Sequence, residues 1–162
     1  MFGNANSNTY SSEAGDDLMC ASAGSDTFSF GKGDSLLNAF DRFTDLEISA
    51  EQIDGLIANS SVSNFGSVRS LKIGDLGQML NNRGFGANLT VSYSLGSGND
   101  TRTFLALNNN RAGFQANNDT VIEITGYSGS LSDLQIIWIH YPKFFALGFC
   151  ALGPLAIDQI IP

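Results

Sequence analysis

The sequence predicts a mainly β protein with a minor helical part. A short parallel β-roll at the N-terminus precedes an antiparallel β meander that carries one short helix. Three observations lead to this prediction: a nine-residue period in residues 1–38, alternation of apolar and polar residues after residue 87, and one run of helical spacing near residue 75. A fixed short period is typical of a repeat fold, and strict alternation is typical of half-buried strands.

The nine-residue steps share a small residue or amide, then an acid or amide, then an apolar residue. They are Asn6-x-Asn8-x-Tyr10, Gly15-x-Asp17-x-Met19 and Gly24-x-Asp26-x-Phe28, with a weaker fourth step at Gly31-x-Gly33 followed by Asp34 and Leu37. Turn-forming residues in each unit oppose a helix, so we expect each apolar residue to lie in a short strand that stacks on the next. Residues 1–45 are therefore predicted to form the roll.

Residues 39–57 favour a strand and a turn. Ser49 and Gln52 resemble a helix capping box, which leaves a short helix as the alternative, although Gly55 would end such a helix early. Residues 58–70 are rich in Ser and Asn, and we expect them to form a connection.

Residues 71–80 are predicted to form a short amphipathic helix. Their apolar side chains recur at near-helical spacing, and Asn81-Asn82 ends the run. Gly74 and Gly77 lie inside this helix and weaken it.

The predicted C-terminal domain comprises residues 46–136. The part of it that follows the helix is predicted to form an antiparallel meander, with the helix covering one face. Polar turns separate its expected strands, which are residues 87–95, 103–107, 112–115 and 120–127. Residues 137–162 form an atypical apolar tail. Pro142, Lys143 and Pro154 interrupt it, which disfavours a membrane-spanning helix and favours a packed terminal strand or a non-native extension.

Composition excludes several classes of function. A net charge of −8 and a pI near 4.3 leave no basic stripe for a nucleic acid. The only histidine is His140, so neither a zinc-protease helix nor a multi-histidine metal site is possible, and we expect no enzyme. Two cysteines, Cys20 and Cys150, make no disulfide framework, and we do not expect them to pair. Residues 1–20 have no apolar core of a secretory signal, so either the export signal lies elsewhere or the chain is a carboxy-terminal fragment of a longer one. Repeats that begin at residue 3 without a cap favour the fragment.

The repeats resemble the hemolysin-type (RTX) nonapeptide that binds calcium in a parallel β-roll. The resemblance continues through FSFGKGDSLLNAFDRFTDLEIS, IDG and RTFLALNNNRAGFQANNDTVIEITGYSGSLSDL, which are similar to the bluetail domain of cyanobacterial surface proteins and to serralysin-like C-terminal domains. It covers about residues 24–136, and RTFLAL and IEITGY are its most specific blocks. The resemblance implies an extracellular or cell-surface location, export by a type I route, calcium as the bound ion, and no catalysis.

The same resemblance implies a set of calcium ligands. Alternate turns would lie on one side of the roll, so that Asn6 and Asn8 face Gly24 and Asp26, and Gly15 and Asp17 face Gly33 and Asp34. Two acids after the last repeat would complete an outer site. The full implied set is Asn6, Asn8, Gly15, Asp17, Gly24, Asp26, Gly33, Asp34, Asp41 and Asp45. Asp54 is a weaker candidate, and Asp119 is better explained as a turn-forming side chain.

Three alternatives stay open at this point. The roll could stack without calcium, since several glycines and acids of the repeat are replaced here. The chain could be an adhesion or protein-binding module whose sheet contacts a partner, or the appendage of a secreted enzyme such as a protease. Our preferred hypothesis is a calcium-binding module in which clustered carboxylates and glycine-rich turns order only when calcium neutralises them.

Overall fold

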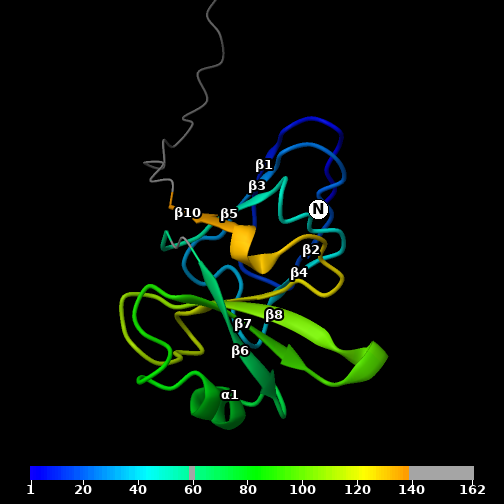
Figure 1. Cartoon of the computed structure of the whole chain (residues 1–162). Coiled ribbons are helices and arrows are strands. Elements are labelled where there is room, and N and C mark those ends of the chain that lie inside the picture. The colour runs from blue at the N-terminus through cyan, green and yellow to red at the C-terminus, as the bar shows by residue number, and fades with distance from the viewer. Residues whose placement is uncertain (59–60, 139–162) are drawn as a thin grey trace, which may run out of the picture.

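A computed structural model describes residues 1–58 and 61–138 of the chain. It confirms the predicted class: 34% of the residues are in strands and one α-helix is present in the described part. The strands form a four-stranded sheet of order β1-β3-β5-β10 and a six-stranded sheet of order β2-β4-β9-β8-β7-β6. Figure 1 shows the roll in the upper part of the view and the meander with α1 below it.

The first three repeat steps form the first three strands, in the predicted register. These strands are β1 (Thr9–Ser11), β2 (Leu18–Met19) and β3 (Thr27–Ser29), and they alternate between the two sheets. β1 and β3 pair in parallel, with Tyr10 opposite Phe28. Because turn residues separate the strands at a constant nine-residue interval, an apolar residue stacks on the equivalent residue two steps further along, in the same sheet.

The prediction of a fourth nine-residue step with Leu37 in the roll is wrong. β4 (Asp41–Phe43) begins fourteen residues after the first residue of β3, and Leu36 pairs with Ala39 in a local antiparallel bridge. Leu37 packs against the meander core instead. The buried Ser35 fixes this detour, because its hydroxyl donates to the carbonyl of Val121 (2.5 Å) and accepts the N–H of Asp41 (2.8 Å).

The strand-and-turn interpretation of residues 39–57 is confirmed. It contains β4 and β5 (Gln52–Asp54), and no helix starts at Ser49. β4 pairs in parallel with β2, and β5 pairs in parallel with β3. The roll therefore continues past residue 45 with longer turns.

Residues 58–70 contain a strand that the sequence did not predict. β6 (Val62–Val68) pairs in parallel with β7 (Thr90–Leu95), with an irregularity between Asn64 and Ser67. The predicted helix is confirmed as α1 (Ile73–Met79), whose Leu76 is buried.

The antiparallel part of the meander consists of β7, β8 (Arg102–Leu107) and β9 (Thr120–Glu123). No strand forms at residues 112–115, because Gly113 has a φ of +83° and the N–H of Gln115 donates to the side chain of Asp119 (2.6 Å). β9 ends at Glu123 rather than at Tyr127, since a turn follows in which the N–H of Tyr127 donates to the carbonyl of Ile124 (3.1 Å).

Two late strands join the roll to the rest of the chain. β9 pairs in parallel with β4, and β10 (Gln135–Ile137) pairs in parallel with β5. Short 3-10 turns, η1 (Gly98–Asp100) and η2 (Leu131–Asp133), precede β8 and β10. Strands from the first 45 residues and from the C-terminal part therefore share both sheets.

Two apolar clusters form the core. The first lies inside the roll, where Phe28 stacks on Tyr10 (ring centroids 5.1 Å apart) and meets Phe43 edge-on (4.6 Å). The second lies between the meander and α1, where Leu76 packs with Tyr93 and other buried side chains. Among the described residues, no helix is long and apolar enough to cross a membrane. The predictions for His140, Cys150 and residues 139–162 concern residues outside the described part.

Candidate metal centre

Several polar and acidic residues of the roll occupy one equivalent position, directly before a strand or, for Asp41, at its first residue. On the first sheet the register aligns Thr9, Thr27 and Gln52, so Asn8, Asp26 and Glu51 stand in adjacent turns. Asp26 is only 1% exposed, and its Oδ1 accepts the N–H of Asn8 (2.8 Å). The implied contact of Asn8 with Asp26 is thus present in the structure.

The implied contact of Asn6 with Gly24 is present as well. A Cβ atom on Gly24 would lie 2.6 Å from the carbonyl oxygen of Asn6, and Gly24 has a φ of +126°. Only glycine combines this backbone conformation with so close an approach of the neighbouring turn. The turn before β3 therefore lies directly against the turn before β1.

On the second sheet, Asp17 pairs with Asp41 rather than with Asp34. The N–H of Asp17 donates to Oδ1 of Asp41 (2.9 Å), and Asp41 is fully buried. Asp34 instead accepts the N–H of Gly31 (2.6 Å) within its own turn. The implied facing of Gly15 and Asp17 with Gly33 and Asp34 is corrected in this way, because the longer step before β4 places Asp41 at the equivalent position.

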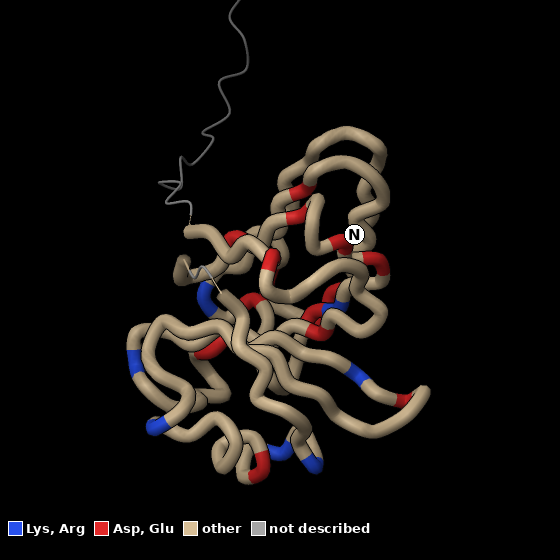
Figure 2. The backbone as a smooth tube through the Cα atoms, viewed as in Figure 1, with Lys and Arg blue, Asp and Glu red and all other residues tan. Residues whose placement is uncertain are grey.

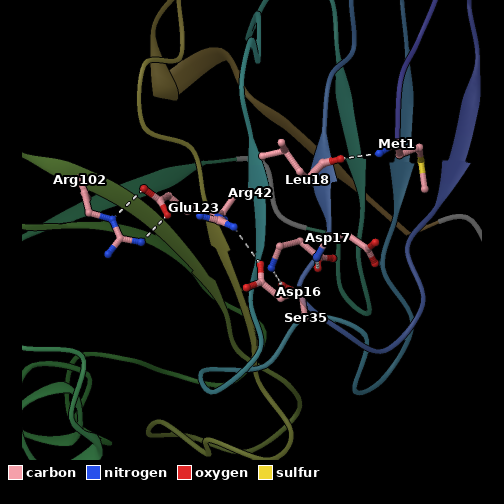
Figure 3. Close-up of polar contacts among 9 residues, drawn as sticks. Met1, Asp16, Asp17, Leu18, Ser35, Arg42, Arg102 and Glu123 are labelled. Carbon is pink, nitrogen blue, oxygen red and sulfur yellow. Dashed lines mark hydrogen bonds and ion pairs between the residues drawn. The ribbon is translucent and has the colours of Figure 1, made fainter.

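Figure 3 shows the surroundings of this second turn, with Asp16, Asp17, Ser35 and Arg42 close together. Arg42 forms an exposed ion pair with Asp16 (3.4 Å). An exposed pair of this kind contributes little to stability and leaves the buried carboxylate of Asp41 without a cationic partner among the ion pairs of the described residues.

Asp45 holds a neighbouring turn and has no spare oxygen. Its carboxylate accepts the N–H groups of Ala21 (2.8 Å) and Ser22 (3.0 Å) and the thiol of Cys20 (3.0 Å). Burial raises the pKa of Asp45, but these hydrogen bonds, led by the one from Cys20, outweigh burial and lower the pKa overall. We therefore assign Asp45 a capping role.

Asp26 and Asp41 each leave one carboxylate oxygen without a partner. Within residues 1–58 and 61–138, Oδ2 of Asp26 and Oδ2 of Asp41 are buried side-chain atoms that accept no hydrogen bond. A buried polar atom without a partner costs free energy, more so when the group carries charge. Both oxygens are hard anionic donors of the type that calcium prefers.

The pKa values reflect this burial. Burial raises the pKa of Asp41 from its ordinary value of 3.8 to about 6, although the N–H of Asp17 partly opposes the shift. Burial also raises the pKa of Glu51 from 4.5 to about 7, while the N–H of Glu47 lowers it and the nearby charge of Asp26 raises it further. Two acids of the roll are therefore costly to ionise in the absence of a cation.

The donor set fits calcium only if the backbone contributes. Among the described residues, no three acidic, thiol or imidazole groups converge on one point. Calcium takes about 6–8 oxygen ligands, including backbone carbonyls. The turns supply two acids on each side of the roll, Asp26 with Glu51 and Asp17 with Asp41, so carbonyl oxygens of the glycine-rich turns would complete the shell.

Glu51 is the member of this set that the sequence analysis missed. It follows Asp26 by twenty-five residues and so lies outside the nine-residue period. Only the pairing of β5 with β3 brings it beneath Asp26, and Glu51 is 2% exposed. The one signal in the sequence was an acid placed two residues before the apolar Ile53, as in the repeats.

Two other candidates have structural roles. Asp54 accepts the hydroxyl of Ser29 (3.2 Å). Asp119 accepts the N–H of Gln115 (2.6 Å) and both the N–H (3.1 Å) and the side-chain amide (2.6 Å) of Asn109, as expected for a turn-forming side chain. No protein-family model matches the chain, and no curated protein is significantly similar to it.

Proposed function

We propose that this chain is a non-catalytic calcium-binding module of a secreted or cell-surface protein, and that its roll orders when calcium binds. The observation that carries the proposal is the pair of buried carboxylates, Asp26 and Asp41, each with one partnerless oxygen at the same position of a stacked turn. The RTX and bluetail resemblance and the parallel stacking of β1, β3 and β5 support it.

Asp26 and Glu51 would hold a calcium ion on one side of the roll, and Asp17 and Asp41 would do so on the other. When bound, the ion supplies positive charge and accepts oxygen ligands. The chain positions these oxygens through its turns: Gly24 lets the turn before β3 approach Asn6, and Asp41 is fixed by the N–H of Asp17. Asn6, Asn8 and Gly15 would contribute amide or carbonyl oxygens from the same turns.

Binding and folding are coupled in this proposal. Without a cation, the folded state must either keep Asp41 and Glu51 protonated or leave buried charge uncompensated, and both choices cost stability at neutral pH. Calcium binds the folded roll and not the open chain, so its binding free energy adds to the free energy of folding. Millimolar extracellular calcium matches weak sites of this type.

A calcium titration followed by circular dichroism and thermal melting tests the proposal. At pH 7.5 we expect calcium up to about 10 mM to raise the melting temperature of the chain, and magnesium at the same concentration to raise it much less. Asp26→Asn and Asp41→Asn should each remove most of the response. Asp100→Asn, which removes the same charge from an exposed turn, should keep it in full.

Two results would contradict the proposal. The first is a melting temperature that calcium does not change at any concentration in this range. The second is an equal loss of response in Asp100→Asn and in Asp41→Asn, which would reduce the effect to general screening of a chain with net charge −8.

A further inference from the structure

Loops at one end of the roll strands line a groove that the calcium proposal does not use. It consists of a pocket of about 530 Å³ and an adjoining pocket of about 290 Å³, which share Leu56, Asn109 and Asn110. Trp138 lines the first pocket, and Lys32 and Arg111 line the second. The groove therefore has an aromatic end and a cationic end, joined by a stretch of amide side chains.

The topology explains why these residues meet. β3, β5 and β10 run in parallel, so the residues that follow them, including Lys32, Leu56 and Trp138, lie at one end of their sheet. Asp26 and Glu51 precede β3 and β5 and lie at the opposite end of the same strands. In Figure 1 the ends of β5 and β10 point to the left of the view, above the green and yellow loops.

The lining of the groove is suited to a ligand rich in hydroxyl groups. The amide side chains that line it belong to Asn88, Asn109, Asn110 and Asn118. The amides of Asn88, Asn110 and Asn118 each carry two donors and one acceptor oxygen, the combination that matches neighbouring hydroxyls on a sugar ring. The amide of Asn109 is already hydrogen-bonded to Gln115, Asp119 and the N–H of Arg111, so it contributes only to the shape of the groove. A purely apolar ligand would leave these groups unpaired, which disfavours it.

Trp138 supplies the flat apolar surface that such a ligand needs. Its side chain is 56% exposed, although large aromatic residues are usually well buried. An indole ring can cover the C–H face of a sugar while polar groups around it bind the hydroxyls. Leu56 and the partly apolar loop around it extend this surface along the groove.

The charge of the groove differs from that of the whole molecule. The chain has a net charge of −8, yet none of the described residues that line the two pockets is acidic, and two are basic. Figure 2 shows acidic residues gathered over the roll and most of the basic ones over the lower part of the view. A groove with Lys32 and Arg111 at one end is complementary to an anionic group on an otherwise neutral ligand.

We propose that this groove binds an acidic oligosaccharide, with one sugar ring on Trp138, hydroxyls on the asparagine amides, and a carboxylate or sulfate at Lys32 and Arg111. A single-stranded nucleic acid would also use aromatic and basic side chains, but it demands a longer basic track than two cations provide. The groove contains no residue of the proposed calcium site, since Asp26 and Glu51 lie at the other end of the strands.

Trp138 is the only tryptophan of the chain, so its fluorescence reports directly on the groove. We would titrate the full chain with trigalacturonate once in EDTA and once in about 10 mM calcium, the condition in which the calcium proposal expects an ordered roll. The emission is recorded in both, with calorimetry as the second readout. The methyl ester of trigalacturonate is the matched neutral ligand. We expect a saturable change in emission with trigalacturonate, and binding that is at least about threefold weaker with the ester.

Three variants separate the contributions. By calorimetry, Trp138→Ala should weaken binding of both ligands about tenfold or more. Arg111→Gln should weaken binding of the acid and leave that of the ester unchanged. Arg83→Gln removes the same charge from an exposed residue that lines neither pocket and should change neither.

Any of three results would overturn the proposal: no binding of the acid or the ester up to about 10 mM, equal weakening by Arg83→Gln and Arg111→Gln, or a preference for oligothymidylate over trigalacturonate. A sulfated trisaccharide as a third ligand distinguishes a carboxylate site from a sulfate site. The two conditions keep the proposals apart, because the groove is built from loops of the roll. Binding in EDTA would contradict the calcium-dependent ordering of the roll, whereas absence of binding to the ordered chain in calcium would contradict the groove.

Discussion

At the scale of single residues, the chemistry of the roll depends on a few buried acids. Asp41 and Glu51 lie in surroundings that raise their pKa values to about 6 and about 7, whereas Asp45 is stabilised in its ionised form by four donors, among them Cys20. These acids differ in their place relative to the strands and in the number of hydrogen-bond donors around the carboxylate. That number decides which acid caps a turn and which one is left with an oxygen for a cation.

The raised pKa of Asp41 makes stability depend on pH when divalent cations are absent. The folded state binds a proton more tightly than the unfolded state, so this contribution is fully present below about pH 4 and is lost as the pH rises through about 6. Between pH 4 and pH 7 the free energy of unfolding should fall by about 2 kcal/mol less in Asp41→Asn than in the unchanged chain. Urea unfolding in EDTA at several pH values measures it.

The matched variant Asp100→Asn should show the pH dependence of the unchanged chain, because Asp100 is exposed in η1. Asp45 and Glu123 act in the opposite direction, because their lowered pKa values stabilise the fold as the pH rises. Their contributions to the free energy of unfolding are the same in both variants and cancel in the comparison. An identical pH dependence in both variants would contradict the burial cost assigned to Asp41.

Gly24 provides a second prediction at this scale. Gly24→Ala forces a Cβ to within 2.6 Å of the carbonyl of Asn6 and places a side chain at a φ of +126°. We expect the free energy of unfolding to fall by about 2–4 kcal/mol, as measured by urea denaturation. Gly33 has a φ of +90°, but an added Cβ there would meet no atom within 4 Å, so Gly33→Ala should cost about 1–2 kcal/mol. Equal losses would show that the turns at Gly24 and Asn6 are not in close contact.

At the scale of elements, the sequence predicted those whose pattern is local. The nine-residue period predicted β1, β2 and β3, and apolar spacing predicted α1, β7 and β8. β6 was missed because its Ser- and Asn-rich sequence has little strand preference of its own, and pairing with β7 makes it a strand. Residues 112–115 are the opposite case, because a strand was predicted there and none forms. Asp119 accepts the N–H of Gln115 that a strand would need for pairing.

α1 contains glycine residues that lower the stability of a helix. Gly77 lies in its interior, with no atom within 4 Å of an added Cβ. Gly77→Ala should therefore raise the free energy of unfolding by about 0.5–1 kcal/mol, because alanine loses less conformational freedom in a helix. Denaturation of this variant beside the unchanged chain tests the expectation, and a loss of stability would contradict the open space around Gly77.

At the scale of the whole molecule, the candidate metal centre contains residues that the repeat pattern of the sequence could not predict. Asp17 and Asp26 follow from the period, but the partners of these acids do not. Asp41 lies next to Asp17 only because the loop before β4 is held by the hydrogen bond from Ser35 to Val121 in β9. Glu51 lies next to Asp26 only because β5 pairs with β3. Both partners depend on contacts between distant segments, which a repeat period does not encode.

Because both sheets combine early and late strands, the described part should unfold as one unit. The cluster inside the roll contains Phe28 and Phe43 together with Ile122 and Ile136. We expect the fluorescence of Trp138, next to β10, and the far-ultraviolet circular dichroism to follow one coincident urea transition with calcium present. A separate early transition of the Trp138 signal would show that β10 leaves the roll independently.

The pairing of β10 with β5 also has a consequence for the rate of folding. Ile136 stands opposite Ile53, and the side chains of Gln52 and Gln135, eighty-three positions apart, are hydrogen-bonded (2.7 Å). Closing so long a loop precedes any gain from the contact, and chains dominated by distant strand pairing fold in milliseconds to seconds. Until β10 docks, the outer edge of β5 stays open, so slow pairing of β10 prolongs the time during which β5 can pair with another chain.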